Sequence, residues 1–170
     1  MRVTTRLRTP ADLPACAAVL ADVHRTDGYP VNWPADPAAW LTQSALISAS
    51  VAERQGRIVG HIGLARSAVG DAAPGLWSAR EGVPVASTAV ISRLFVDPAS
   101  RGHGIGALLM ARAAREARER GLHPVLDVVA SDTAAAALYE RLGWERLATV
   151  EQRWGPDTTV TVRCYAAPRD

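Results

Sequence analysis

The sequence contains no lysine, and all 19 of its basic residues are arginine. Functions that need a lysine amine are therefore excluded, among them Schiff-base chemistry with a pyridoxal cofactor and the phosphate-binding lysines of P-loop proteins and kinases. The 19 arginines are offset by 17 acidic residues, which leaves a formal net charge of +2. A nucleic-acid-binding protein needs a dominant basic surface, so this near balance argues against nucleic acid as a partner.

Cysteine is scarce, with Cys16 and Cys164 as the two examples. Two cysteines cannot form a structural zinc site alone, and no histidine spacing completes one, so we expect no metal. One cysteine falls in a predicted helix and the other in a predicted strand, far apart in the sequence. We expect both to be reduced, semi-buried thiols of a cytoplasmic protein.

Long apolar runs are also missing. No run approaches the roughly 20 residues that a membrane-spanning helix needs. The N-terminal segment MRVTTRLRTP is charged and alternating, unlike a signal peptide, so we expect neither a membrane partner nor secretion. A length of 170 residues, 48% of them hydrophobic and 21% charged, predicts one globular domain over residues 1–170.

The spacing of apolar residues and the positions of glycine and proline predict the secondary structure. Strands are predicted at residues 3–7, 46–53, 58–66, 88–96, 124–130, 144–150 and 158–165. Helices are predicted at residues 10–24, in a short stretch that starts at 36–37, at 105–120 and from 131 or 132 to 142, with loops at 25–34 and 67–84. This order indicates an α+β, or mixed α/β, fold in which helices cover a central sheet.

A glycine-rich segment between a predicted strand and a predicted helix is the most informative part of the chain. It reads RGHGIG, and Gly102, Gly104 and Gly106 occupy alternate positions. Glycines let the backbone pass close to a ligand, and the helix N-terminus directs unpaired N–H groups and the positive end of its dipole to the same place. The pattern predicts a pyrophosphate site, to which Arg101 and His103 add side-chain contacts.

A dinucleotide-binding motif is the rival interpretation of this segment. Gly102, Gly104 and Ala107 fit its loose glycine pattern, and Asp127 follows about 20 residues later. In that motif, however, the strand leads directly into the first glycine, whereas here Asp-Pro-Ala-Ser-Arg intervenes. The unit also lies late in the chain and leaves too little sequence for a doubly wound sheet, so we set this interpretation aside.

Residues 93–144 resemble the GNAT family of N-acetyltransferases. The family's core motif, Arg/Gln-x-x-Gly-x-Gly/Ala, is matched by Arg101, Gly104 and Gly106. A second block, Asn-x-x-Ala-x-x-Leu-Tyr-x-x-x-Gly-Phe, is matched from Asp132 to Trp144 except at those two end positions. Two motifs in the right order and at the right separation make the resemblance specific.

The resemblance implies a GNAT-like acyl-CoA N-acyltransferase fold, with a central, mostly antiparallel, splayed sheet of about seven strands and about four flanking helices. It implies acetyl-CoA as cosubstrate and no metal. The backbone of Leu94, Phe95 and Val96 would pair with the pantetheine arm, and backbone N–H groups of residues 102–106, with Ile105 among them, would hold the pyrophosphate.

The resemblance also assigns Tyr139 as the acid that protonates the leaving thiolate. Asp132 replaces the usual Asn; it can still cap a helix, but it offers no amide N–H to the pantetheine. The base is left open, because strand 88–96 contains no Asp or Glu. The candidates for this role are a relay through ordered water and four side chains: His61, His24, Asp27 and Glu81.

The implied reaction moves an acetyl group from acetyl-CoA to a primary amine of a small molecule or peptide by direct attack. The alternative is a non-catalytic acyl-CoA-binding or sensing module on the same fold. The acceptor pocket is expected from loops 25–34 and 67–84, where the aromatic residues Tyr29, Trp33 and Trp77 occur with the acidic residues Asp27, Asp36 and Glu81. This lining suits a cationic amine, or else the tryptophans pack the loops onto the core. The acceptor, the acyl-chain preference and the oligomeric state, a homodimer included, stay open.

Overall fold

The computed structural model describes residues 2–169 and contains one seven-stranded sheet in the order β1-β2-β3-β4-β5-β7-β6. The strands are β1 (Val3–Leu7), β2 (Leu46–Arg54), β3 (Arg57–Ala65), β4 (Thr88–Val96), β5 (His123–Val129), β6 (Glu145–Gly155) and β7 (Thr158–Ala166). The α-helices are α1 (Leu13–Asp27), α2 (Pro37–Leu41), α3 (Ala73–Glu81), α4 (Ile105–Glu119) and α5 (Thr133–Arg141). Strand pairing is antiparallel for β1–β2, β2–β3, β5–β7 and β6–β7 and parallel for β4–β5. The predicted α+β class and mostly antiparallel sheet are confirmed, with one helix more than expected.

The chain divides into two compact units. Unit 1 consists of the residues up to Ala65 together with Ile91–Arg115, and unit 2 of Arg66–Val90 together with the residues from Glu116 onward. Strand β4 and helix α4 therefore contribute residues to both. Each unit is described below by itself.

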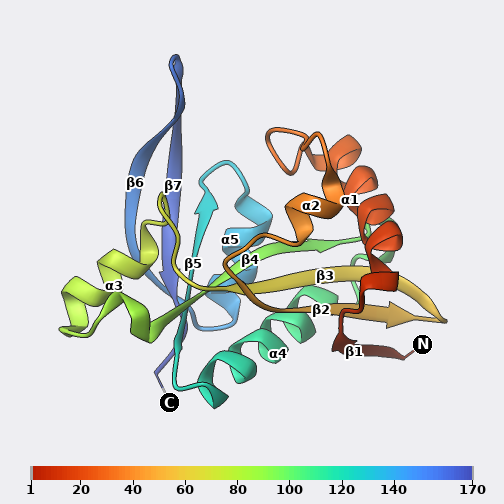
Figure 1. Cartoon of the computed structure of the whole chain (residues 1–170), viewed down its shortest axis with the longest axis horizontal. Helices are drawn as coiled ribbons and strands as arrows, with labels where there is room; N and C mark the ends of the chain where they lie inside the picture. The colour runs from red at the N-terminus through yellow and green to blue at the C-terminus, as the bar shows by residue number, and fades with distance from the viewer. Residues whose placement is uncertain (1, 170) are drawn as a thin grey trace. The chain divides into compact units, whose positions relative to one another are not determined.

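In unit 1, helices cover both faces of the sheet, with α1 and α2 on one side of β2 and β3 and α4 on the other (Figure 1). Strand β3 shows how residues on its two faces pack against these two layers of helices. A Cβ at Gly60 would lie 3.0 Å from the Leu109 side chain and 3.1 Å from that of Ile105, so a glycine here lets α4 approach closely. The next residue, His61, stacks on Phe95, which belongs to the apolar cluster of α1, α2 and β2.

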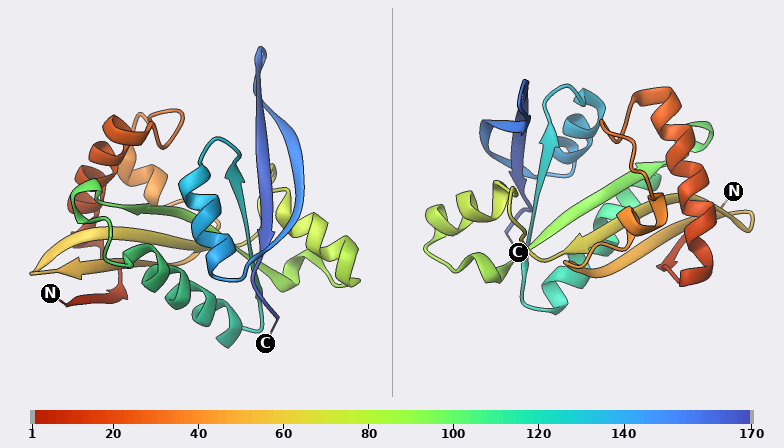
Figure 2. Two further views of the ribbon diagram at one scale, coloured as in Figure 1. Left: turned by 180° about the vertical axis from the view of Figure 1, so that it is seen from behind. Right: turned by 45° about the horizontal axis from the view of Figure 1, so that its top comes forward.

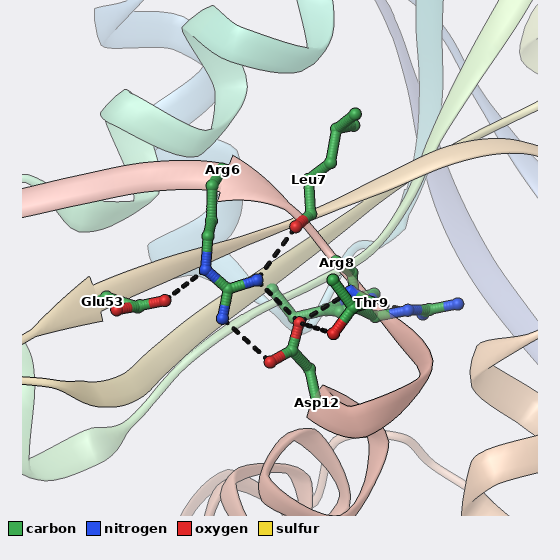
Figure 3. A network of polar contacts seen from close by, with 7 residues as sticks. Arg6, Leu7, Arg8, Thr9, Asp12 and Glu53 are labelled. Carbon is green, nitrogen blue, oxygen red and sulfur yellow. Dashed lines mark hydrogen bonds and ion pairs between the residues drawn. The ribbon is translucent and has the colours of Figure 1, made fainter.

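A polar network fixes β1 to β2 and to the start of α1 (Figure 3). The Arg6 guanidinium donates to both carboxylate oxygens of Asp12, at 2.7 and 2.8 Å, and pairs with Glu53. Asp12 also accepts the backbone N–H of Thr9 at 2.7 Å. The Arg6 hydrogen bonds are the largest cause that holds the pKa of Asp12 well below its usual range, and desolvation of this buried carboxyl opposes them. The predicted helix start is therefore held by a tertiary ion pair as well as by local capping.

In unit 2, helices α3 and α5 lie on opposite sides of β5 and β7 (Figure 2). Successive residues of β7 point to opposite faces. Cys164 packs in one cluster with Trp77 of α3, whereas the Tyr165 ring lies 5.7 Å from the Tyr139 ring of α5. The C-terminal part of β7 is therefore buried on both faces.

The prediction of a loop over residues 67–84 was wrong, because this segment contains helix α3. The local sequence carries few helix signals, since glycine and proline interrupt it. Asp127 of β5 supplies the missing cap by accepting the N–H groups of Ala72 and Ala73 at 2.7 and 2.9 Å. A carboxylate at this end of a helix also interacts favourably with the helix dipole. Asp127 thus acts as a tertiary helix cap.

Two smaller differences concern the first loop and the cysteines. Helix α1 extends to Asp27, so the first residues of the predicted loop 25–34 are helical, and Gly28 follows with φ +73°. Cys16 and Cys164 are free thiols, as predicted, but both are fully buried. Burial raises the pKa of Cys16 to about 11 and that of Cys164 to about 12.

Candidate functional site

The RGHGIG segment comprises the exposed last four residues of the connection from β4 and the first two residues of α4. Gly102 and Gly104 have φ of +86° and +71°, a conformation that favours glycine, and a Cβ at either position would have nothing within 4 Å. Arg101 and His103 are exposed as well, whereas Ile105 is buried against β3. The predicted helix start directly behind the segment is confirmed. The N-terminus of α4 is therefore accessible to a ligand, because the preceding glycines leave space beside the backbone.

Asp97 fixes the base of this connection. Its carboxylate accepts the N–H of Ala99 at 3.1 Å and the hydroxyl of Ser100 at 3.4 Å. Its own N–H donates to the carbonyl of Val59 in β3 at 2.8 Å. Asp97 and Ser100 are both buried. A loop that is ordered in advance loses less conformational entropy when a ligand binds.

Arg101 forms an ion pair with Asp27 at the end of α1. One guanidinium nitrogen lies 3.2 Å from a carboxylate oxygen, and a second pair of atoms is also in contact. The side chains are 45% and 38% exposed. Exposed pairs of this kind contribute at most about 1 kcal/mol, so Arg101 can turn to a phosphate at little cost. The pair brings a candidate phosphate ligand and a candidate base together.

The three residues expected to face pantetheine lie in the last part of β4. The β4–β5 ladder covers three residue pairs, from Thr88–His123 to Val90–Val125, and Leu94, Phe95 and Val96 lie beyond it. Phe95 is buried, and its two neighbours are half-buried.

His61 of the neighbouring strand β3 stacks on Phe95 in this part of β4 and is fully buried. The Arg8 guanidinium, which can only donate, contacts Nε2 at 2.9 Å, so Nδ1 carries the proton and donates to the carbonyl of Arg93 at 2.9 Å. Burial lowers the pKa of His61 to about 4, although the hydrogen bond to Arg93 opposes the shift. Both ring nitrogens are occupied by protein groups, so His61 is not the base.

This buried histidine makes the stability of the fold depend on pH. Its pKa is lower in the folded protein than the ordinary value of 6.5, so the unfolded chain binds more protons between pH 6.5 and about 4. We expect His61 to lower the free energy of unfolding by about 3 kcal/mol as the pH falls through that range. Urea unfolding of the wild type and of His61→Asn at several pH values measures this slope. Equal slopes in the two proteins would contradict the assignment.

The other base candidates occupy different surroundings. The ring nitrogen Nδ1 of His24 lies 2.9 Å from the carbonyl of Pro30. Glu81 ends α3 in unit 2, where it pairs with Arg169 at 2.5 Å and with Arg80 at 3.4 Å. The structure therefore removes His61 from the candidates and leaves the base unassigned.

Tyr139 lies in α5 and Asp132 is the N-cap residue immediately before it, both in unit 2. The Tyr139 side chain is buried, with ring centroids of Trp144 at 6.2 Å and Tyr165 at 5.7 Å. Asp132 accepts the N–H of Ala135 at 3.1 Å, which confirms its predicted helix cap. The departure from the family's Asn therefore leaves the local structure intact.

The aromatic residues of the two expected acceptor loops have different roles. Trp77 is buried and stacks on His123 at 4.0 Å, so packing explains it. Tyr29 packs edge-on against Trp40, whereas Trp33 is 41% exposed beside His24. Of the three aromatic side chains, Trp33 is therefore the one that faces solvent.

Two residues important to the site, Arg8 and Arg93, were missed by sequence reasoning. Arg93 adopts φ +52° immediately before Leu94. Arginine gives no local signal for such a conformation, which glycine and asparagine prefer. Arg8 appeared as one charged residue of the alternating N-terminal segment, and its contact with His61 is purely tertiary.

Among residues 2–169, no group of three His, Cys, Asp or Glu side chains is arranged to hold a metal ion. Over the same range, no helix is long and apolar enough to cross a membrane.

The fold is that of N-acetyltransferases. An N-acetyltransferase from Staphylococcus aureus Mu50 superposes with a TM-score of 0.74 at 20% identity, over 98% of both chains. A GNAT family acetyltransferase from Brucella melitensis, solved in complex with acetyl-CoA, has a TM-score of 0.61 at 20% identity, over 99% of this chain and 90% of that one.

The chain belongs to the GNAT acetyltransferase family, whose model matches residues 18–144. A mycothiol acetyltransferase from Rhodococcus erythropolis (strain PR4 / NBRC 100887) is 46% identical over 52 residues. That match covers 30% of this chain and 17% of the relative, which is less than a fifth of the relative's length.

Proposed function

We propose that the protein transfers an acetyl group from acetyl-CoA to a primary amine of a small molecule or peptide. The observation that carries the proposal is the exposed RGHGIG connection, with left-handed glycines at Gly102 and Gly104, at the start of α4 in a chain of the GNAT family. Free N–H groups at a helix N-terminus suit a pyrophosphate, and the missing side chains leave room for it.

The proposed roles of the binding residues are those that the GNAT motif implies for their positions. Backbone N–H groups of residues 102–106 hold the pyrophosphate, and the exposed Arg101 and His103 add side-chain contacts. The backbone of Leu94, Phe95 and Val96 pairs with the pantetheine arm as an added strand would. Such pairing depends on backbone groups, so it fixes the thioester along β4 whatever the side chains are.

The amine attacks the thioester carbon directly, without an acetyl-enzyme. A nucleophilic cysteine must be accessible and ionised, whereas burial raises the pKa values of Cys16 and Cys164 to about 11 and about 12. The new C–N bond forms as the amine adds, the C–S bond then breaks, and Tyr139 donates its proton to the departing thiolate. The extra proton on the nitrogen that has added returns to the Tyr139 oxygen, directly or through water, which gives the neutral amide and restores the tyrosine. A base or a water relay removes the proton of the ammonium before attack.

Two measurements separate this enzyme from a non-catalytic acyl-CoA-binding module. Isothermal titration with acetyl-CoA detects binding in both cases. Only a catalytic protein releases free thiol when primary amines are added. The panel of amines runs from polyamines to peptide N-termini. Binding without amine-dependent thiol release across the panel would favour the module, and absence of binding would overturn both functions.

Asp132→Asn tests the departure from the family motif. Asn keeps an oxygen that accepts the N–H of Ala135, so the helix cap persists, and it adds an amide N–H that can donate to pantetheine. We expect acetyl-CoA to bind a few-fold more tightly, within the roughly 1 kcal/mol typical of one neutral hydrogen bond. Titration of both proteins measures the change. Weaker binding by the Asn variant would show that the carboxylate has a role of its own.

A further inference from the structure

The backbone of β4 is distorted immediately before the proposed pantetheine-binding residues. Arg93 has φ +52°. A non-glycine residue in this left-handed conformation is strained, so its surroundings must hold it there. The distortion sets the direction in which the peptide groups of Leu94 and the following residues point. Contacts that hold Arg93 therefore bear on the proposed coenzyme site.

His61 holds the carbonyl of this residue from the neighbouring strand. Its Nδ1–H donates to the Arg93 carbonyl at 2.9 Å, and its ring stacks on Phe95 at 5.0 Å with an interplanar angle of 13°. The ring is fully buried, so its N–H donor is shielded from water. The contact thus joins the strained peptide to the side chain of the second pantetheine-facing residue.

Arg8 fixes the protonation state that this contact needs. A guanidinium has no acceptor, so its contact with Nε2 at 2.9 Å requires an unprotonated Nε2 and places the proton on Nδ1. The opposite tautomer would turn a lone pair toward the Arg93 carbonyl. Both residues that contact the ring nitrogens, Arg8 and Arg93, carry a positive charge, and these charges further favour the neutral ring.

Further contacts of the distorted segment also lie within unit 1. The Arg93 guanidinium lies over the Trp40 ring at 4.1 Å. The side chain of Gln43 donates to the Ser92 hydroxyl at 3.2 Å. Opposite, a Cβ at Gly63 would lie 3.1 Å from that hydroxyl and 3.2 Å from the Ser92 carbonyl, so glycine lets β3 approach the distorted segment.

We propose that His61 is a positioning residue for the acyl-CoA: locked in its Nδ1–H tautomer by Arg8, it holds the Arg93 peptide so that the backbone of the next three residues presents its hydrogen-bonding groups to the pantetheine arm. The role rests on the proposed function, because it needs acyl-CoA at β4. His61 acts through the backbone and does not touch the substrate. Its loss therefore weakens coenzyme binding and leaves the acceptor KM unchanged.

Two amide substitutions test this role as a matched pair. In His61→Asn the amide N–H takes the place of Nδ1–H and still reaches the Arg93 carbonyl. In His61→Gln the amide takes the place of Nε2, so it meets Arg8 and leaves the carbonyl without its donor. We expect the acetyl-CoA dissociation constant to stay within about threefold of wild type for Asn and to rise at least about tenfold for Gln, which is about 1.4 kcal/mol.

Arg8→Met provides a second measurement should His61→Gln fail to fold. It keeps the histidine and removes the group that fixes its tautomer, so we expect acetyl-CoA affinity to fall at least about threefold. Imidazole ¹⁵N spectra of the wild type should show a protonated Nδ1. A protonated Nε2, or unchanged affinity in Arg8→Met, would overturn the proposal.

Acetyl-CoA binding by the wild-type protein distinguishes a failure of this proposal from a failure of the proposed function. A wild-type protein that binds no acetyl-CoA overturns the proposed function, and the role of His61 with it. If the wild type binds and the folded Asn and Gln variants bind equally well, the role of His61 alone is overturned. Equal losses of thermal stability in the two variants with unchanged affinity would show a purely structural histidine.

Discussion

Tyr139→Phe is expected to lower the turnover number by about tenfold to a thousandfold while acetyl-CoA affinity and the acceptor KM stay near wild type. A free thiol has a pKa of about 8.5, so a thiolate can leave without full protonation, and the acid contributes a moderate factor. The substitution removes one hydroxyl and keeps the ring that packs between Trp144 and Tyr165. An interaction made in the transition state lowers kcat without raising KM.

Tyr165→Phe is the matched control for this experiment. It removes a hydroxyl from the adjacent ring, where the group donates to Glu140 at 2.6 Å, and we expect turnover within about twofold of wild type. Steady-state thiol release gives the turnover numbers, and titration with acetyl-CoA checks affinity separately. If Tyr139→Phe also retains turnover within about twofold while chemistry is rate-limiting, another donor protonates the thiolate.

Gly104→Val is expected to raise the acetyl-CoA dissociation constant at least about tenfold, or about 1.4 kcal/mol. A Cβ at Gly104 has nothing within 4 Å, so the protein itself does not clash with the new side chain. The branched side chain instead occupies the space through which the pyrophosphate approaches the backbone. Titration of the folded variant measures the loss.

Gly121→Val controls for the backbone strain of this substitution. Gly121 follows α4 and has the same φ of +71°, and a Cβ there would also have nothing within 4 Å, but it lies outside the RGHGIG segment. Both valines therefore introduce a similar strain in the left-handed region. We expect Gly121→Val to lower stability and keep affinity. Unchanged affinity in Gly104→Val, or an equal loss in both variants, would contradict the phosphate assignment.

Local sequence signals predicted the strand, glycine-rich connection and helix that make up the proposed coenzyme site. Each depends on short-range physics: apolar spacing in β4, glycines that permit positive φ, and periodic apolar positions in α4. Helix α3 escaped prediction because its cap, Asp127, is 54 and 55 positions away from the residues it binds. A window of neighbouring residues cannot contain that interaction.

The sequence by itself therefore determined the family, the order of the strands and of the helices other than α3, and the segments proposed to hold the coenzyme, because all of these follow from the types and spacing of nearby residues. The tertiary structure decided which candidate side chains are accessible and in which protonation state. His61 was one of four candidate bases until folding buried it between Arg8 and Arg93, which are 53 and 32 positions away. Burial and these two partners together keep its ring neutral and occupied, since desolvation and hydrogen bonding depend on groups that folding alone brings together.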